Sequence, residues 1–225
     1  MAGFEEIRCL DAPLAERLAA YANHLTDAKP RIAGVYSALV DRLRAADAGS
    51  DAPEIGSVLP AFLLPDNEGR LVSSPELQSV GPLVVSFNRG HWCAFCQLEL
   101  LALAEIYPEV RRLGGELVSV MPDRAAPTNR LKETFNIPFR VLTDIDNGYA
   151  LTCGLVISLG DAVRDVYLGA GRNLSEFQGN DACFVPIPAT FVIGRDGCIM
   201  GRFVDPDFRR RMAPTDILEC LEQIR

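Results

Sequence analysis

The sequence predicts an α/β fold in which helices flank a central sheet of mixed strand direction, preceded by a helical extension. Three observations support this prediction. A helical pattern separates two short apolar runs, residues 83–87 and 117–121, as in a βαβ unit with parallel strands. Two later apolar runs, 190–193 and 198–203, flank a Gly-Arg-Asp-Gly turn, which predicts an antiparallel hairpin. Residues 12–47 carry apolar side chains at helical spacing.

The first unit is a helical extension that we assign to residues 1–50. Apolar side chains from Leu14 to Leu25 share one helical face, and Pro30 separates this helix from a second one over residues 31–46. A linker rich in Gly, Ser, Asp and Pro leads to the second unit, residues 51–225. We expect the extension to pack against the rest of the chain or a second copy rather than to take part in chemistry.

The remaining elements of the second unit follow from the same periodicities of two and 3.6 residues. Buried strands are short and continuously apolar, and turn residues such as Asp, Asn and Gly mark where strands end. The pattern predicts strands over 62–64, 71–72 and 140–143, a helix from about 96 to 110, and helical segments over 128–135, 149–153, 161–167 and 214–224.

Composition and charge exclude several classes of function. The 225 residues carry a net charge of −8, so we expect no nucleic-acid partner, because such a surface needs a basic stripe. No stretch approaches the ~20 apolar residues of a membrane span, and the first 14 residues carry acidic groups instead of the apolar core of a signal peptide. We therefore expect a cytoplasmic protein without a membrane partner, in a compartment that keeps thiols reduced.

Cys93 and Cys96 stand where the predicted strand 83–87 gives way to a helix. Functional groups collect at this end of strands in open α/β sheets. A helix N-terminus presents free N–H groups and a partial positive charge, and both favour a thiolate over a thiol. Such a thiol has a pKa lowered from ~8.5 to between ~3.5 and ~7.5. With only two residues between them, the sulfurs can close a disulfide, which indicates a redox-active pair.

Zinc binding and core packing are the competing interpretations of this pair. A zinc site built from cysteines usually has a second pair, and here the other cysteines are isolated in the sequence. We therefore expect neither a metal nor another cofactor. The isolated cysteines are interpreted as small buried residues: Cys9, Cys153, Cys183, Cys198 and Cys220. Cys153 and Cys183 are alternatively distant resolving cysteines, but we expect a Cys183→Ser variant to keep its turnover.

The segment Phe87–Leu100, which reads FNRGHWCAFCQLEL, resembles the active-site segment of a known family. That family is the peroxiredoxin-like branch of the alkyl hydroperoxide reductase/thiol-specific antioxidant proteins. The resemblance extends from about Gly56 to the C-terminus and includes the segment Ile187–Phe191. It implies a thioredoxin-like fold, peroxide substrates, a thiol reductant such as thioredoxin or glutathione, and a homodimer.

Two departures from the family pattern bear on the chemistry. In the register of the family motif Pro-x-x-x-Thr-x-x-Cys, the peroxidatic cysteine falls on Cys96 and its threonine partner on Cys93. The family also places an arginine just before the strand that begins at Thr190, where this chain has Pro188. Thioredoxin has a cis-proline at that place facing its cysteine pair, so we expect a cis Ile187–Pro188 bond; the alternative is an ordinary trans proline.

Two catalytic interpretations use the same sulfurs with exchanged roles. In a peroxidase, Cys96 attacks the peroxide, becomes a sulfenic acid, and condenses with Cys93 to a disulfide. In a thioredoxin-like disulfide reductase, Cys93 attacks a protein disulfide lying against Pro188, and Cys96 resolves the mixed disulfide. The resemblance favours the peroxidase. A third interpretation is a non-catalytic redox-sensing or binding module, against which the intact cysteine pair argues.

Four further side chains near the pair are candidates for supporting roles. Arg89 would stabilise the thiolate and the leaving oxygen by its charge, or be merely solvated or salt-bridged. His91 would donate a hydrogen bond to a reacting oxygen, or only cap the loop. Trp92 is expected to shield the sulfurs. Glu99 would orient groups near Cys96, or face solvent.

Overall fold

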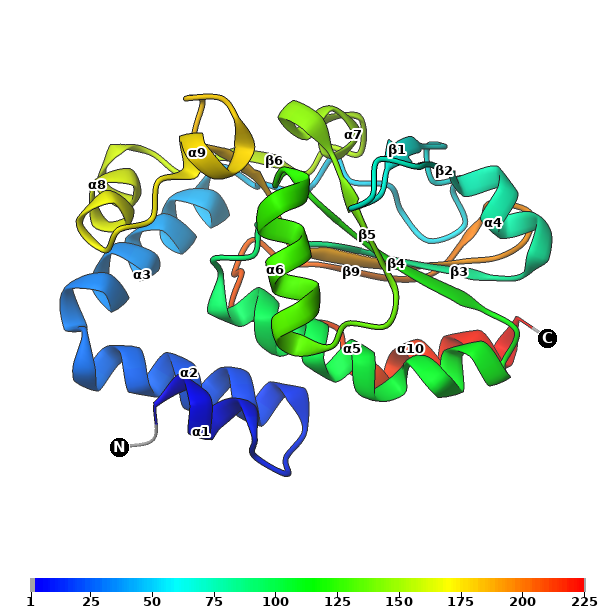
Figure 1. Ribbon diagram of the computed structural model, residues 1–225, viewed down its shortest axis with the longest axis horizontal. Helices are drawn as coiled ribbons and strands as arrows, with labels where there is room; N and C mark the ends of the chain where they lie inside the picture. The colour runs from blue at the N-terminus through cyan, green and yellow to red at the C-terminus, as the bar shows by residue number, and fades with distance from the viewer. Residues whose placement is uncertain (1–2, 225) are drawn as a thin grey trace.

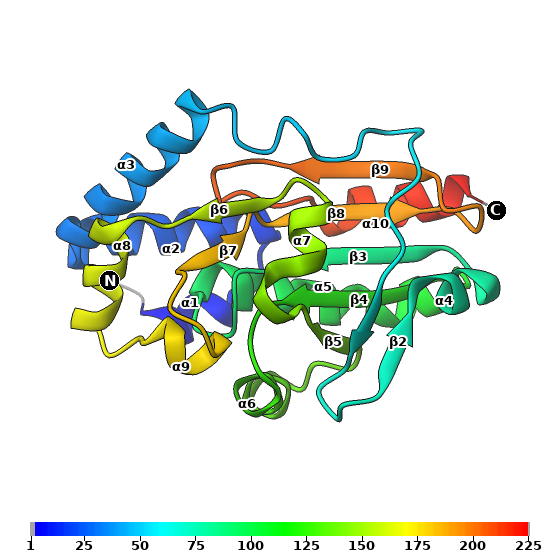
Figure 2. The ribbon, with the colours of Figure 1, turned by 90° about the horizontal axis from the view of Figure 1, so that it is seen from above.

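The computed structural model describes residues 3–224, in which a five-stranded sheet of order β5-β4-β3-β8-β9 forms the centre (Figures 1 and 2). The strands β3 (Leu83–Phe87), β4 (Glu116–Met121) and β5 (Arg140–Thr143) run parallel. The hairpin of β8 (Ala189–Ile193) and β9 (Ile199–Val204) joins β3 in antiparallel register. The α/β fold with a mixed sheet is confirmed.

Two helices cover one face of this sheet, α5 (Ala94–Arg112) and α10 (Pro214–Gln223) (Figure 1). All five residues of β3 and of β8 are buried, which is why these strands have no alternation of polar and apolar side chains. The helix α5 ends at Arg112, and Gly114, just beyond its C-cap Leu113, has φ +79°, a conformation that glycine adopts without strain.

The other elements surround the sheet, and several are too short for their periodicity to predict them. A three-residue ribbon, β6 with β7, and the short helices α1, α4 and α9 were not predicted. The bounds are α1 Phe4–Arg8, α2 Leu14–Ala28, α3 Pro30–Ala45, β1 Leu63–Pro65, β2 Leu71–Ser73, α4 Ser74–Val80, α6 Ala125–Phe135, a 3₁₀ turn Ile145–Asn147, α7 Gly148–Thr152, β6 Val156–Ser158, α8 Asp161–Gly169, α9 Leu174–Gln178 and β7 Phe184–Pro186.

The N-terminal helices α2 and α3 pack against the rest of the chain and share its apolar core. Helix α2 contacts α5, and α3 contacts α8 (Figure 1). Tyr21 of α2 meets Phe95 of α5 edge to face, with 5.1 Å between the ring centroids. The buried Arg17 binds Glu105 through two hydrogen bonds of 2.7 and 2.9 Å. The boundary between residues 50 and 51 stays a prediction.

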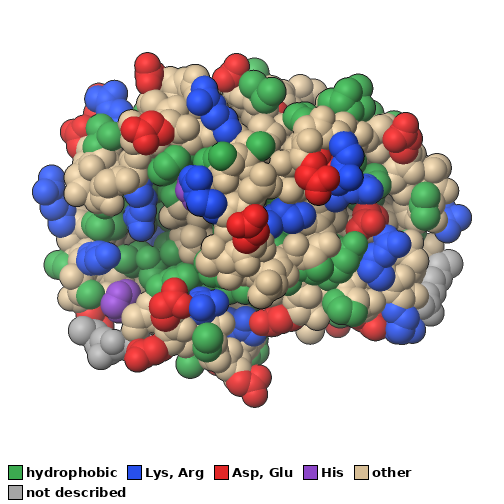
Figure 3. Space-filling model, viewed as in Figure 1, with side chains coloured by type: hydrophobic (Ala, Val, Ile, Leu, Met, Phe, Trp, Pro, Cys, Tyr) green, Lys and Arg blue, Asp and Glu red, His purple; other side chains and the backbone are tan. Residues whose placement is uncertain are grey.

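Charges of both signs are interspersed over the face seen in Figure 3, without a broad basic area. None of the helices within residues 3–224 combines the length and the apolar character that crossing a membrane requires.

The expectation of a cis bond before Pro188 was wrong, since the peptide bonds between residues 3 and 224 contain no cis bond. The chain runs extended from β7 into β8, and the Ile187 amide donates to the Leu155 carbonyl at 2.7 Å. A trans bond keeps this path straight, so that Ala189 pairs with Phe87 at the start of β8. Pro188 therefore stands directly before β8, next to the end of β3.

Candidate active site

Cys93 and Cys96 lie at the carboxyl end of β3, the middle strand of the sheet. Cys93 is the N-cap residue of α5, with extended backbone angles of φ −88° and ψ 108°, and its carbonyl accepts the Gln97 amide at 2.9 Å. The first turn of a helix has amide groups without a partner in the helix, and they create a positive potential there. Cys96 follows within that turn. The expected junction of a buried strand and a helix N-terminus is present.

Burial distinguishes the two sulfurs. Cys93 is 5% exposed, whereas Cys96 is fully buried at 0%. Both are free thiols, as are the other cysteines among the described residues. A small molecule arriving from solvent therefore reaches Cys93 first.

The loop before Cys93 is fixed by close packing. Gly90 has φ +140°, and a Cβ there would lie 2.4 Å from Trp92 Nε1, so only glycine fits. The amide of His91 donates to the Asp123 carboxylate at 2.6 Å, and His91 Nδ1 lies 2.8 Å from the same oxygen. The His91 carbonyl accepts from the Gln97 side chain at 2.5 Å. These contacts support the loop-capping interpretation of His91.

Arg89 is fully buried beside the cysteine pair. Its Nη2 donates to the Tyr167 hydroxyl at 2.8 Å, and its guanidinium carbon lies 3.9 Å from the Phe208 ring centroid and 5.3 Å from that of Trp92. The Arg89 Nε and Nη1 atoms have no partner within residues 3–224. Because an isolated buried charge is costly, this cation needs a nearby anion. Solvation of Arg89 is excluded.

A second buried cation, Arg211, lies against Cys96. Its Nη2 is 3.4 Å from the Cys96 sulfur, its Nε donates to the Glu99 carboxylate, and its Nη1 donates to the Phe208 carbonyl. Glu99 is 1% exposed and also accepts from the Ser86 hydroxyl at 3.2 Å. Glu99 thus orients Arg211, and the solvent-facing alternative for this carboxylate is excluded.

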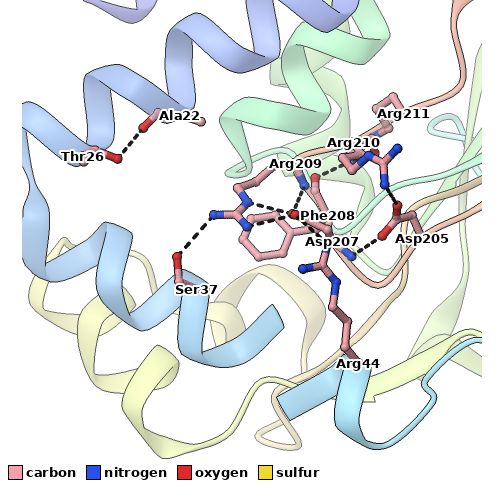
Figure 4. Close-up of polar contacts among 10 residues, drawn as sticks. All are labelled: Ala22, Thr26, Ser37, Arg44, Asp205, Asp207, Phe208, Arg209, Arg210 and Arg211. Carbon is pink, nitrogen blue, oxygen red and sulfur yellow. Dashed lines mark hydrogen bonds and ion pairs between the residues drawn. The ribbon is translucent and has the colours of Figure 1, made fainter. Parts of the chain in front are cut away.

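The sequence pattern did not identify Arg211. It belongs to the run Arg209–Arg211, which precedes α10, a helix that begins only at Pro214. Arg209 binds Asp207 and Arg210 binds Asp205 (Figure 4), while Arg211 turns inward. Its contact with Glu99 joins residues 112 positions apart, and no local signal indicates such a pair.

The pKa values of the two thiols are shifted in opposite directions. Burial by itself raises the pKa of Cys93, but a hydrogen bond with the Cys96 thiol and the charges of Arg89 and Arg211 together outweigh it and lower the pKa to about 6. Burial raises the pKa of Cys96 well above its ordinary value, and the hydrogen bond and charge of Cys93 raise it further. The arrangement is therefore a Cys93 thiolate backed by a Cys96 thiol.

Aromatic side chains enclose this pair. The Trp92 ring lies 4.9 Å from that of Tyr167, and its shielding of the sulfurs stays a prediction. Tyr36 of α3 contacts Phe208 and Tyr167, with centroid distances of 5.1 and 6.1 Å. The N-terminal extension thus supplies part of the wall around the cysteines, which the sequence analysis did not anticipate.

Among the described residues, no hydrogen bond or disulfide joins Cys153 or Cys183 to the pair. Cys153 is fully buried; burial raises its pKa to about 12, against a hydrogen bond with Tyr149 that lowers it. Cys183 lies in the turn before β7, with φ +52°. Cys93, Cys96, Arg89, Trp92 and Glu99 come together at one place, and Pro188 directly precedes Ala189, which pairs with Phe87 at the end of β3.

Comparison with known proteins gives a consistent result. A model of the AhpC/TSA family matches residues 55–202. The chain is 30% identical to the chloroplastic peroxiredoxin Q of Oryza sativa subsp. japonica over 41% of its own length and 42% of that relative, so it matches less than half of that protein. It is 22% identical to the thiol-disulfide oxidoreductase ResA of Bacillus anthracis, over 73% of this chain and 78% of ResA.

Among solved structures, the peroxidoxin BcpB of Mycobacterium tuberculosis has the same fold. The two chains superpose with a TM-score of 0.59 at 19% sequence identity, over 76% of this chain and 98% of that one. At this identity the likeness supports the thioredoxin-like fold that the sequence motif implied.

Proposed function

Because the chain belongs to the AhpC/TSA family, we propose that it is a thiol-dependent peroxidase that reduces hydrogen peroxide or alkyl hydroperoxides. One observation carries the proposal. A cysteine whose pKa is lowered to about 6 stands at a helix N-terminus beside the buried Arg89, with a second thiol behind it. A thiolate is the reactive form of cysteine towards peroxides, and Arg89 offers unpaired N–H groups to the oxygens.

In this proposal Cys93 attacks first, which reverses the order that the family register implied. Its sulfur bonds to one peroxide oxygen while the O–O bond breaks, giving a sulfenic acid and an alcohol or water. The Cys96 thiol then displaces hydroxide from the sulfenic sulfur, so a Cys93–Cys96 disulfide forms and water leaves. A dithiol reductant such as thioredoxin, or two molecules of glutathione, restores both thiols.

A protein disulfide reductase is the second candidate, since the nearly accessible Cys93 in front of the buried Cys96 is also the arrangement such an enzyme needs. Enclosure argues against it. Cys93 is only 5% exposed, and aromatic rings of α2, α3 and α8 surround it. A small peroxide needs far less space than a protein disulfide, for which the wall would have to open. A non-catalytic module would not need a thiol with this pKa.

Rapid mixing of the reduced protein with stoichiometric hydrogen peroxide tests the proposal. Trp92, the only tryptophan, reports the reaction by its fluorescence. We expect oxidation much faster than that of free cysteine, and slow reduction of an added protein disulfide such as that of insulin. Oxidation at the rate of free cysteine together with fast insulin reduction would instead establish the disulfide reductase.

We also propose a cytoplasmic location, because seven cysteines without a disulfide framework fit a reducing compartment. Fractionation of the source cells with an antibody to the protein would test this. The homodimer that the resemblance implies stays a prediction, which sedimentation of the purified chain would check.

A further inference from the structure

The hydroxyl groups of Tyr36 and Tyr167 form a hydrogen-bonded pair inside the wall of the site. The Tyr167 side chain is 1% exposed and Tyr36 is 7% exposed. The Tyr167 oxygen accepts Arg89 Nη2 at 2.8 Å and a second hydrogen bond links it to Tyr36. Burial raises the pKa of both phenols, and their mutual bond raises that of Tyr36 further but lowers that of Tyr167. This bond places one hydrogen between the two hydroxyl oxygens.

The hydrogen count of this pair leaves one proton unused. Two hydroxyl hydrogens are present, and their mutual bond uses one of them. Arg89 can only donate, so it takes none. Within the described part of the chain neither hydroxyl has another acceptor. With Tyr36 as the donor to Tyr167, the spare hydrogen is that of Tyr167, which is 1% exposed.

Several buried donors near Tyr167 are unpaired, and one unpaired acceptor, Asp123 Oδ1, lies on the Trp92 side of them. Arg89 Nε, Arg89 Nη1 and Trp92 Nε1 are buried and have no partner within residues 3–224. Unpaired buried donors are costly, so a cluster of them indicates a place built for a ligand rich in acceptor atoms. Trp92 directly precedes Cys93, and its ring lies 4.9 Å from that of Tyr167, so this cluster lies next to the attacking residue.

We propose that Tyr167 is a further catalytic residue that protonates the leaving oxygen of the peroxide, with Tyr36 as its proton relay. This inference rests on the proposed peroxidase activity. As the Cys93 sulfur bonds to the terminal oxygen of R–O–O–H, the O–O bond breaks and sulfur loses two electrons to the peroxide. The product R–O⁻ takes the Tyr167 proton and leaves as R–OH. The tyrosinate, held by Arg89, regains a proton from Tyr36, and Tyr36 from solvent.

A proton donor should affect two reactions of the Cys93 thiolate differently. Reduction of a peroxide expels a strongly basic oxygen and benefits from an acid, and general acid catalysis contributes about 10²-fold or more. Alkylation by iodoacetamide expels iodide and needs no proton. Loss of the Tyr167 hydroxyl should therefore slow the first reaction and spare the second. Each rate is measured at a pH above the Cys93 pKa of that variant, so that a change in thiolate fraction does not enter.

The experiment compares Tyr167→Phe with Tyr36→Phe and with Tyr107→Phe. The last is a matched control, because its hydroxyl binds Glu116 at 2.9 Å, at the far end of α5. We expect Tyr167→Phe to lower the rate of oxidation by hydrogen peroxide about 100-fold while alkylation stays within threefold of wild type. Tyr36→Phe should have a smaller effect on oxidation, and Tyr107→Phe none.

Three results would overturn the role. Oxidation of Tyr167→Phe at the wild-type rate would show that it donates no proton. Equal slowing of oxidation and alkylation would show that the hydroxyl only maintains the thiolate or the fold. A larger loss in Tyr36→Phe than in Tyr167→Phe would assign the proton to Tyr36. The wild type is measured first, since oxidation no faster than that of free cysteine would refute the peroxidase itself.

Discussion

Replacing Arg89 by methionine tests whether this buried cation maintains the Cys93 thiolate. Methionine fills a similar volume without charge, and the remaining cation near the pair, Arg211, is engaged by Glu99. We expect the Cys93 pKa to rise from about 6 by about one to two units, because one of the two cations that lower it is lost.

The magnitude follows from the thiolate fraction. At pH 7 that fraction falls from about nine tenths to between about one half and one tenth when the pKa rises to about 7–8. The thiolate fraction is measured from the rate at which iodoacetamide alkylates Cys93 at each pH between 4 and 10, with mass spectrometry as the readout. The variant should react about two- to tenfold more slowly at pH 7, and the defect should vanish near pH 9.5, where both proteins are fully ionised.

The sign of the pH dependence is part of this prediction. Below its pKa Cys93 is a neutral thiol, so the wild-type rate should fall about tenfold per pH unit below pH 6 and level off above about pH 7. Arg130→Met, which removes an exposed arginine, is the matched control and should keep the wild-type midpoint. A midpoint near pH 6 in Arg89→Met would refute the account of the thiolate.

The remaining predictions concern packing around the site. Arg211→Met should cost about 3–5 kcal/mol in urea unfolding, because it leaves Glu99 buried without its partner; adding Glu99→Gln should recover much of this, and a loss below about 1 kcal/mol would contradict the pairing. Gly90→Ala should change the near-ultraviolet circular dichroism of Trp92 and slow oxidation, and an unchanged spectrum would count against the close approach. Tyr21→Ala should speed modification of Cys93 by a bulky maleimide more than by iodoacetamide; equal effects would show that α2 does not limit access.

Most of the sheet was predictable because its strands are buried on both faces. The continuous apolar runs of β3 and β4 and the turn before β9 are local signals that need no knowledge of the rest of the chain. The short ribbon of β6 and β7 has only three residues in each strand, too few for a periodic pattern. The trans bond at Pro188 depends on how β7 feeds into β8, which is a tertiary property.

The cysteine pair was likewise predictable, because the strand, the cysteines and the helix are adjacent in sequence. The groups that tune it were only partly visible. Arg89 lies four residues from Cys93, whereas Arg211, Tyr36 and Tyr167 arrive from distant elements and have no motif of their own. The order of attack depends on burial and on these cations, so it could not be read from the family register alone.

The central claim is that Cys93, rather than Cys96, attacks the peroxide. The most direct test mixes reduced Cys96→Ser and Cys93→Ser proteins with one equivalent of hydrogen peroxide and traps sulfenic acid with dimedone for mass spectrometry. The account predicts that Cys96→Ser forms a sulfenic acid at Cys93 at the wild-type rate, while Cys93→Ser reacts no faster than free cysteine. A fast sulfenic acid at Cys96 in the Cys93→Ser protein would contradict it.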